Sequence, residues 1–225
     1  MKKGKFIVIE GSDGSGKKTQ TDLLIKRLKE KKIKTSYFDF PQYYTSFFGK
    51  MITRYLNGEF GTADEVSPYL ASILYAGDRF EASEKIRDDL DNGKYIISNR
   101  YIQSNMAFQT AKIRLKSEKK KFLNWLEKIE YEIFKIPKAD LVIYLYVPYK
   151  IGQELVDKKG KRKYSKQQRD IHERDGDFLC RVEKEYLNLA ETRKEWQIIN
   201  CIENGKILSR EKIAEKVYAI VKKTT

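Results

Sequence analysis

The stretch Phe6-Ile7-Val8-Ile9-Glu10-Gly11-Ser12-Asp13-Gly14-Ser15-Gly16-Lys17-Lys18-Thr19 decides the fold of this 225-residue chain. An apolar run typical of a buried strand leads into a glycine-rich loop, and residues 19–25 continue as a helix. Gly11 to Lys17 fits the phosphate-binding pattern G-x-x-x-x-G-K. Glycines let backbone N–H groups turn toward phosphate oxygens, and a helix N-terminus adds partial positive charge. An ordinary glycine-rich turn would not explain a lysine at the helix entrance.

The residue after the loop lysine departs from this pattern. That position is normally Ser or Thr, whose hydroxyl binds Mg²⁺. Here it is Lys18, which cannot ligate a cation. Thr19 follows, but one step along a helix turns a side chain about 100° away. Metal binding must therefore rest more on other groups, and Lys18 either contacts phosphate or points to solvent.

The composition indicates a globular protein. Hydrophobic residues make up 40% of the chain, so 225 residues can form one domain with a full core. No apolar run reaches the roughly eighteen residues of a membrane span, and the N-terminus lacks the apolar stretch of a signal peptide. Cys180 and Cys201 form neither a disulfide framework nor a metal-binding spacing. We therefore expect a cytoplasmic protein with no membrane partner.

The formal net charge of +14 allows three interpretations. The charge could serve an anionic small substrate, a nucleic acid, or solvation of the surface. The lysines are dispersed over helices and loops, and no known nucleic-acid-binding module is present. We therefore expect no nucleic-acid partner, and we interpret most of the charge as solvated surface with a local subset for phosphate binding.

Strand-like and helical segments alternate along the chain. Strands are predicted at residues 6–10, 35–38, 95–98, 141–147 and 197–200. Apolar residues recur at helical spacing over residues 66–77 and again over residues 122–134. This alternation predicts an α/β fold with a central parallel five-stranded sheet that is flanked by helices.

Residues 157–170 form a basic, polar stretch with almost no apolar side chains. One interpretation is a solvated loop. The other is a mobile lid, over about residues 157–172, whose cations close over phosphates. Arg162, Lys166 and Arg169 are the candidate lid cations.

Four further segments extend the pattern beyond the glycine-rich loop. They are Phe40-Pro41-Gln42-Tyr43, Tyr75-Ala76-Gly77-Asp78-Arg79, Asn99-Arg100-Tyr101-Ile102-Gln103-Ser104-Asn105 and His172-Glu173-Arg174-Asp175. With the loop, and in this order, they make the whole chain resemble the thymidylate kinase family, whose members transfer the γ-phosphoryl group of ATP to dTMP. The resemblance implies the P-loop nucleoside monophosphate kinase fold with a short basic lid, and a homodimer formed through packed helices.

The resemblance also implies the binding residues. The phosphates of ATP should be held by Gly11, Ser12, Asp13, Gly14, Ser15, Gly16, Lys17, Lys18 and Thr19. The dTMP site should comprise Phe40, Pro41, Tyr43, Tyr75, Arg79, Arg100, Ser104, Asn105 and Phe108. Lys17, Asp13 and Arg100 should carry the catalysis.

Several residues of the implied dTMP site have individual roles. Tyr75 should stack on thymine, and Asn105 should hydrogen-bond the edge of the base. Arg79 should reach either the base or the acceptor phosphate. Arg100 should bind the phosphate of dTMP, a task that suits a guanidinium fork. Phe108 should crowd a ribose 2′-OH. His172, the only histidine, fits packing or hydrogen bonding better than catalysis of phosphoryl transfer.

The implied metal site is incomplete. Lys18, Asn99 and Tyr146 each stand where the family usually has a group associated with Mg²⁺. Asp13 and Glu173 remain as candidate ligands of Mg²⁺, together with the nucleotide phosphates. The sequence thus predicts a kinase that uses MgATP and dTMP. Two alternatives stay open: a kinase for dUMP, another nucleotide or a deoxynucleoside, and a catalytically impaired nucleotide-binding protein.

Overall fold

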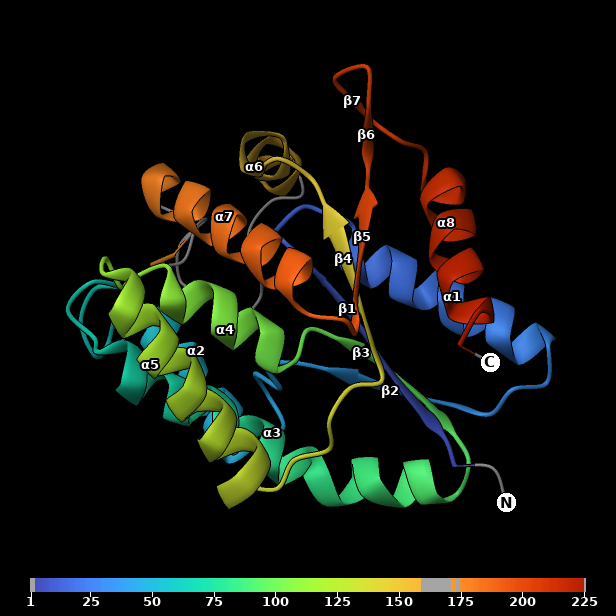
Figure 1. Ribbon diagram of the computed structural model, residues 1–225, viewed down its shortest axis with the longest axis horizontal. Coiled ribbons are helices and arrows are strands. Elements are labelled where there is room, and N and C mark those ends of the chain that lie inside the picture. Colours follow the sequence, from blue (N-terminus) through green and yellow to red (C-terminus); the bar gives the residue numbers. More distant parts are fainter. Residues whose placement is uncertain (1–2, 159–170, 173–174, 225) are drawn as a thin grey trace.

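Five parallel strands form the centre of the structure, a computed structural model that describes residues 3–158, 171–172 and 175–224 (Figure 1). The strands are β1 (Lys5–Gly11), β2 (Thr35–Asp39), β3 (Tyr95–Asn99), β4 (Leu141–Tyr146) and β5 (Trp196–Asn200). Their order in the sheet is β2-β3-β1-β4-β5, and every neighbouring pair is parallel. The predicted α/β fold and its five-stranded sheet are confirmed.

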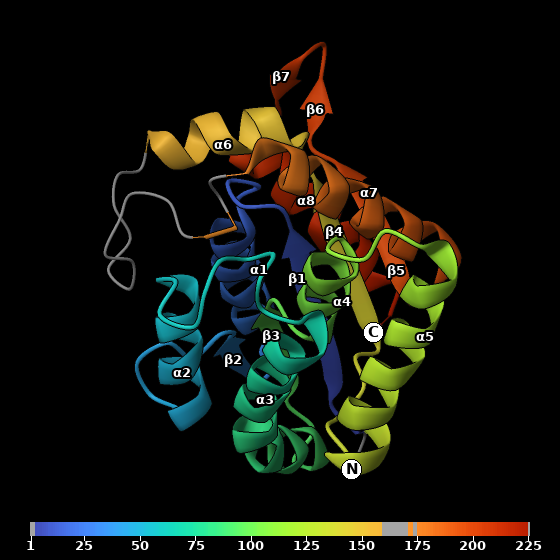
Figure 2. The ribbon, with the colours of Figure 1, turned by 90° about the vertical axis from the view of Figure 1, so that its left-hand side faces the viewer.

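Helices cover both faces of this sheet (Figures 1 and 2). Helices α1 (Lys17–Glu30) and α8 (Arg210–Lys222) lie on one face. The other face carries α3 (Pro68–Asp91), α4 (Ile102–Thr110), α5 (Lys116–Glu127) and α7 (Gly176–Thr192). Helix α2 (Phe47–Leu56) packs against α3, and α6 (Tyr149–Asp157) packs against α7.

Strand β1 shows how the sequence supports this layering. Phe6 and Val8 belong to the core cluster on the side of α3, α4 and α7, whereas Ile7 and Ile9 belong to the cluster on the side of α1 and α8. All four side chains are at most 1% exposed. Alternate side chains of a strand face opposite sides of the sheet, so a strand covered on both faces needs an unbroken apolar run.

The helix that periodicity predicts over residues 122–134 is not continuous. Helix α5 ends at Glu127, and a π-helix, η1, covers Lys128–Ile133. Apolar spacing does not distinguish the two helix types over a single turn. A small antiparallel hairpin, which the sequence patterns did not predict, is formed by β6 (Ile202–Glu203) and β7 (Lys206–Ile207).

Among the described residues, no helix combines the length and apolar character that crossing a bilayer requires. The carboxyl ends of β1, β2 and β3 meet at one edge of the sheet, because parallel strands run in the same direction. Open parallel sheets bind ligands at this edge. The candidate site lies there.

Candidate functional site

The glycine-rich loop joins β1 directly to α1, as the phosphate-binding motif requires. Gly16 precedes the helix with φ of 85°, and no side chain caps the first N–H groups of α1. The first turn of α1 also contains no acidic residue. A helix N-terminus without a side-chain cap or an acidic residue, together with the helix dipole, favours an anion at this position.

Gly14 allows the loop to pack closely against α6. Its φ is 82°, and a Cβ atom at this position would lie only 2.1 Å from the carbonyl oxygen of Gly152. Any side chain at residue 14 would therefore displace the loop or α6. The tight packing fixes the loop that the sequence analysis assigned to ATP phosphates.

Lys17 points into the curve of this loop. Its Nζ donates to the carbonyl oxygens of Gly11 and Ser12 at 3.0 Å and 2.8 Å, and the residue is 7% exposed. Lys18 lies at the surface instead, where its ammonium group contacts both carboxylate oxygens of Asp22 at 2.6 Å and 2.7 Å. Only the first lysine is buried in the loop.

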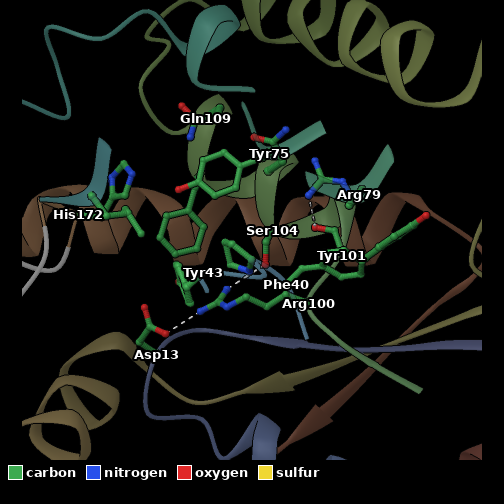
Figure 3. Close-up of a pocket in the computed structure, with 14 residues that line it drawn as sticks. Asp13, Phe40, Tyr43, Tyr75, Arg79, Arg100, Tyr101, Ser104, Gln109 and His172 are labelled. Atoms are coloured by element: carbon green, nitrogen blue, oxygen red, sulfur yellow. Dashed lines mark hydrogen bonds and ion pairs between the residues drawn. The ribbon is translucent and has the colours of Figure 1, made fainter. Parts of the chain in front are cut away.

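A pocket opens beside the loop (Figure 3). Its walls include Asp13 and all nine residues that the sequence analysis assigned to the dTMP site: Phe40, Pro41, Tyr43, Tyr75, Arg79, Arg100, Ser104, Asn105 and Phe108. Leu56, Tyr101, Gln109 and His172 complete the lining. The structure therefore brings together residues from the loop, α3, α4 and the segment after β2, although they are distant in sequence.

Arg100 connects the loop to the pocket. Its Nη2 donates to Asp13 Oδ1 at 2.6 Å, and its Nη1 donates to Ser104 Oγ at 2.9 Å. The backbone of Arg100 is left-handed, with φ of 63°, a conformation uncommon for residues other than glycine. Burial lowers the pKa of Arg100, but the charges of Asp13, Tyr186, Glu10 and Tyr43 together outweigh burial, so the pKa is raised well above its usual value. The guanidinium therefore stays charged.

Glu10 supports this arrangement and was missed by the sequence analysis. Its buried carboxylate accepts hydrogen bonds from the N–H groups of Tyr101 and Ser104 at 2.9 Å and 3.1 Å. It also accepts from the hydroxyls of Ser104 and Tyr186 at 2.8 Å and 2.9 Å. The sequence did contain a signal for this role, because Glu10 is a carboxylate next to the apolar run of a buried strand. A buried charge needs hydrogen-bond partners, so such a residue indicates a polar network.

Two amide side chains lie in the pocket wall formed by α4. Asn105 donates through Nδ2 to the Ser72 carbonyl oxygen at 3.2 Å, while its Oδ1 has no partner in the described part of the chain. Gln109 is 0% exposed, and neither its Oε1 nor its Nε2 has a partner there. Unsatisfied buried amides are costly, so both side chains are suited to hydrogen-bond a ligand in the pocket. Gln109 was not among the site residues predicted from the sequence.

Phe108 and His172 form an aromatic wall of the pocket. The ring of Phe108 lies 5.7 Å from the ring of His172 and 5.5 Å from the guanidinium carbon of Arg100. His172 is 4% exposed, and burial, followed by the charge of Lys112, lowers the pKa of His172 to about 3. The imidazole is therefore neutral at physiological pH.

Arg79 lines the pocket on the side away from Asp13 (Figure 3). Its guanidinium group is 2% exposed and binds the carboxylate of Glu130, a residue of η1. Its Nη1 also donates to the Tyr101 carbonyl oxygen at 3.4 Å. Arg79 thus reaches the pocket already paired with a carboxylate.

The described residues contain no group of three or more His, Cys, Asp or Glu side chains that could hold a metal ion. The Asp13 carboxylate binds Arg100 and lies 3.9 Å from Lys17 Nζ. Asn99 donates to Asp39 at 2.7 Å. The candidate ligand Glu173 and the lid residues Arg162, Lys166 and Arg169 lie outside the described residues. Within the described part of the phosphate loop, Asp13 is therefore the one carboxylate that could bind a metal ion.

Comparison with known proteins gives a consistent result. Residues 9–213 match the sequence model of the thymidylate kinase family. The chain is 32% identical to the thymidylate kinase of Plasmodium falciparum over 203 residues, which cover 89% of each protein. It is 33% identical to a probable thymidylate kinase of Thermococcus kodakarensis over 214 residues, covering 93% of this chain and 95% of that one.

A solved structure shares the fold. The thymidylate kinase of Candida albicans superimposes with a TM-score of 0.75 at 24% sequence identity. The superposition covers 99% of this chain and 92% of the yeast protein. The agreement extends over the whole sheet and its helices, which is the P-loop nucleoside monophosphate kinase architecture.

Proposed function

Because the chain belongs to the thymidylate kinase family, we propose that it transfers the γ-phosphoryl group of ATP to dTMP and produces dTDP and ADP. The observation that carries this proposal is the position of Arg100. Its guanidinium contacts Asp13 of the phosphate loop at 2.6 Å and also lines the pocket that holds Tyr75 and Asn105. One side chain thereby borders both nucleotide sites.

The proposed roles follow from charge and position. ATP phosphates bind the N–H groups of the loop and the ammonium group of Lys17, while the phosphate of dTMP binds Arg100. The transferred phosphoryl group passes through a loose transition state, so positioning and charge neutralisation supply most of the catalysis. Lys17 and Arg100, which both lie beside Asp13, neutralise charge as it develops.

The base lies at the other end of the pocket in this proposal. Tyr75 stacks on thymine, and Asn105 and Gln109 hydrogen-bond its edge. These amides retain three buried polar atoms without partners in the described part of the chain. Phe108 lies between the base end and Arg100, where its ring would crowd a ribose 2′-OH. The pocket therefore suits a deoxynucleotide with a hydrogen-bonding base.

We propose Mg²⁺ as the metal of the reaction. Asp13 is the described carboxylate placed to bind it, and Glu173 is the second candidate. Because the described residues of the loop offer one carboxylate, the ATP phosphates would provide most of the ligands to the ion, as is common for Mg²⁺. When bound, the ion would neutralise charge on the phosphate oxygens.

We further propose that residues 1–225 form one kinase domain with a lid over about residues 157–172, and that the protein is a cytoplasmic homodimer. Helix α3 supports the dimer because three of its large apolar side chains are exposed: Leu70 at 64%, Ile73 at 37% and Phe80 at 49%. Val66 and Leu74 pack internally, so only part of the predicted contact face is available. Sedimentation of the purified protein would measure its oligomeric state.

The function is tested by measuring ADP formation with ATP and a panel of acceptors. We expect dTMP to give the highest kcat/KM, dUMP a lower value, and dCMP, purine nucleotides and deoxynucleosides little activity. A preference for deoxynucleosides would support the alternative kinase. ATP binding without phosphoryl transfer to any acceptor would support the impaired nucleotide-binding protein.

A further inference from the structure

The π-helix η1 places a carboxylate inside the protein, next to the pocket. Glu130 of η1 is 0% exposed, and its two carboxylate oxygens accept from Arg79 Nε at 3.1 Å and 3.0 Å. Arg79 Nη2 makes a further contact with the same carboxylate. π-Helical turns are rare and often occur at functional sites. In this protein the π-helical turn η1 carries Glu130, which is the ion-pair partner of the pocket residue Arg79.

The hydrogen bonds of Arg79 show what remains for a ligand. A guanidinium group has five N–H donors. Glu130 occupies Nε and one hydrogen of Nη2, and the Tyr101 carbonyl oxygen is 3.4 Å from Nη1. Within the described ranges, one N–H on each terminal nitrogen has no hydrogen-bond acceptor, and Arg79 lines the pocket. These two donors suit an acceptor atom of a bound ligand.

Charge indicates which acceptor that is. The pair of Arg79 and Glu130 has no net charge, and both side chains are almost completely buried. Such a pair attracts a phosphate dianion weakly, because the dianion also meets the carboxylate. Arg100 is also paired with a carboxylate, Asp13, but it adjoins the phosphate loop, where the ammonium group of Lys17 lies 3.9 Å from the same carboxylate. The phosphate therefore belongs with Arg100, and Arg79 suits a neutral oxygen.

We propose that Glu130 is a positioning residue that holds Arg79 as an oriented N–H donor to an exocyclic carbonyl oxygen of the acceptor's pyrimidine base. The inference rests on the proposed function and deepens it. An amino group in place of that oxygen would point its own hydrogens at the hydrogens of Arg79. Glu130 therefore contributes to the choice between a 4-oxo and a 4-amino pyrimidine without touching the base.

A purely structural ion pair would make a different prediction. Removing it would lower stability and affect all acceptors alike. A positioning role instead changes the ratio of kcat/KM between two acceptors that differ at one atom group. The two nucleotides dTMP and 5-methyl-dCMP serve this purpose. The 4-oxo group of dTMP is a 4-amino group in 5-methyl-dCMP, and N3 carries a proton only in dTMP.

The experiment measures this ratio in the parent, Glu130→Gln and Glu127→Gln. Glu127 is the matched control, because it lies in the preceding helix and pairs with Arg193 at 2.5 Å away from the pocket lining. We expect Glu130→Gln to reduce the preference for dTMP by about tenfold or more, mainly through a higher KM for dTMP. Glu127→Gln should keep the parental preference.

Calorimetry with ATP alone verifies that each variant retains its phosphate site. If Glu130→Gln does not fold, the ratio is read in Glu130→Asp, which keeps the charge and should retain more of the preference than Arg79→Met. An unchanged ratio in folded Glu130→Gln overturns the inference and leaves dTMP kinase activity intact. Absence of parental activity on dTMP overturns the proposed function and the inference with it.

Discussion

The guanidinium of Arg100 donates to the carboxylate of Asp13 over 2.6 Å, which joins the carboxyl end of β3 to the phosphate loop after β1. Its second nitrogen is held by Ser104, which Glu10 binds in turn. The two proposed substrate sites are therefore connected through one fixed side chain. A residue in this position can orient an acceptor phosphate toward the loop.

Arg100→Lys tests whether the fork of the guanidinium matters beyond its charge. Lysine keeps the positive charge but cannot contact Asp13, Ser104 and a phosphate with fixed planar geometry. Losing a charged hydrogen bond costs roughly 1.5–3 kcal/mol, so we expect kcat/KM for dTMP to fall about tenfold to a hundredfold. Steady-state kinetics measure this effect, and parental kinetics in the variant would contradict the assigned role.

Lys17→Ala should affect chemistry more than binding of dTMP. The ammonium group lies inside the loop and is proposed to neutralise charge that develops during transfer. We expect kcat to fall by about a hundredfold to a thousandfold. Calorimetric affinity for dTMP should change little. Lys18→Ala is the matched control, because Lys18 binds Asp22 at the surface, and turnover should stay close to the parental value.

Phe108→Ala should weaken the selection against ribose. Removing the ring opens space beside Arg100 and His172, where we propose the sugar binds. We expect the deoxy-to-ribo preference, measured as the kcat/KM ratio of dUMP to UMP, to fall about tenfold. If the ratio is unaltered, Phe108 serves only the packing of α4 against α7.

Asp13→Asn and Glu173→Gln test the proposed metal ligands. Both variants should need more Mg²⁺ for half-maximal rate, because the protein offers the ion few carboxylates. The control is Asp22→Asn, which removes an exposed carboxylate that binds Lys18. An unchanged Mg²⁺ requirement in Glu173→Gln would leave Asp13, phosphates and water as the only ligands.

His172 should make stability depend on pH. Its pKa is lowered to about 3 in the folded protein, mainly by burial, and should be about 6.5 when unfolded. The unfolded chain therefore binds more protons between these values, and stability falls as pH decreases below about 6.5, by up to about 1.4 kcal/mol per pH unit.

Denaturant unfolding at pH 7 and pH 5 measures this dependence. His172→Phe should lose less stability than the parent over this range, because it lacks the titrating ring. The chain has one histidine, so its NMR titration is unambiguous. A titration midpoint near 6.5 in the folded protein would rule out this explanation.

The sequence predicted the sheet well because its signal is strong. Strand β1 contains an apolar run at residues 6–9 and β4 is apolar or aromatic throughout, and burial on both faces requires such runs. Strand β2 has a weaker pattern, with only Phe38 buried, and was still predicted because residues 35–38 form a strand-like run. The hairpin of β6 and β7 was missed, although Asn204 and Gly205 between them carry the usual turn signal.

The pocket was predicted less completely than the sheet. Its nine assigned residues fall in short motifs at the ends of strands and helices, so resemblance could locate them. Glu10 offered a sequence signal as a carboxylate in an apolar strand, whereas Glu130 is identified only by its buried partner. Gln109 lies one helical turn after Asn105, and single-sequence patterns cannot tell a pocket amide from a surface one. The chemistry around each arginine therefore needed three-dimensional structure.

Transfer of label from [γ-³²P]ATP to dTMP tests the central claim most directly. The purified protein, with Mg²⁺, should produce dTDP labelled at its terminal phosphate in equal amount to the ADP formed. Lys17→Ala should form far less of both products under the same conditions. Label that appears as inorganic phosphate, or that passes to another acceptor in preference to dTMP, would contradict the assignment.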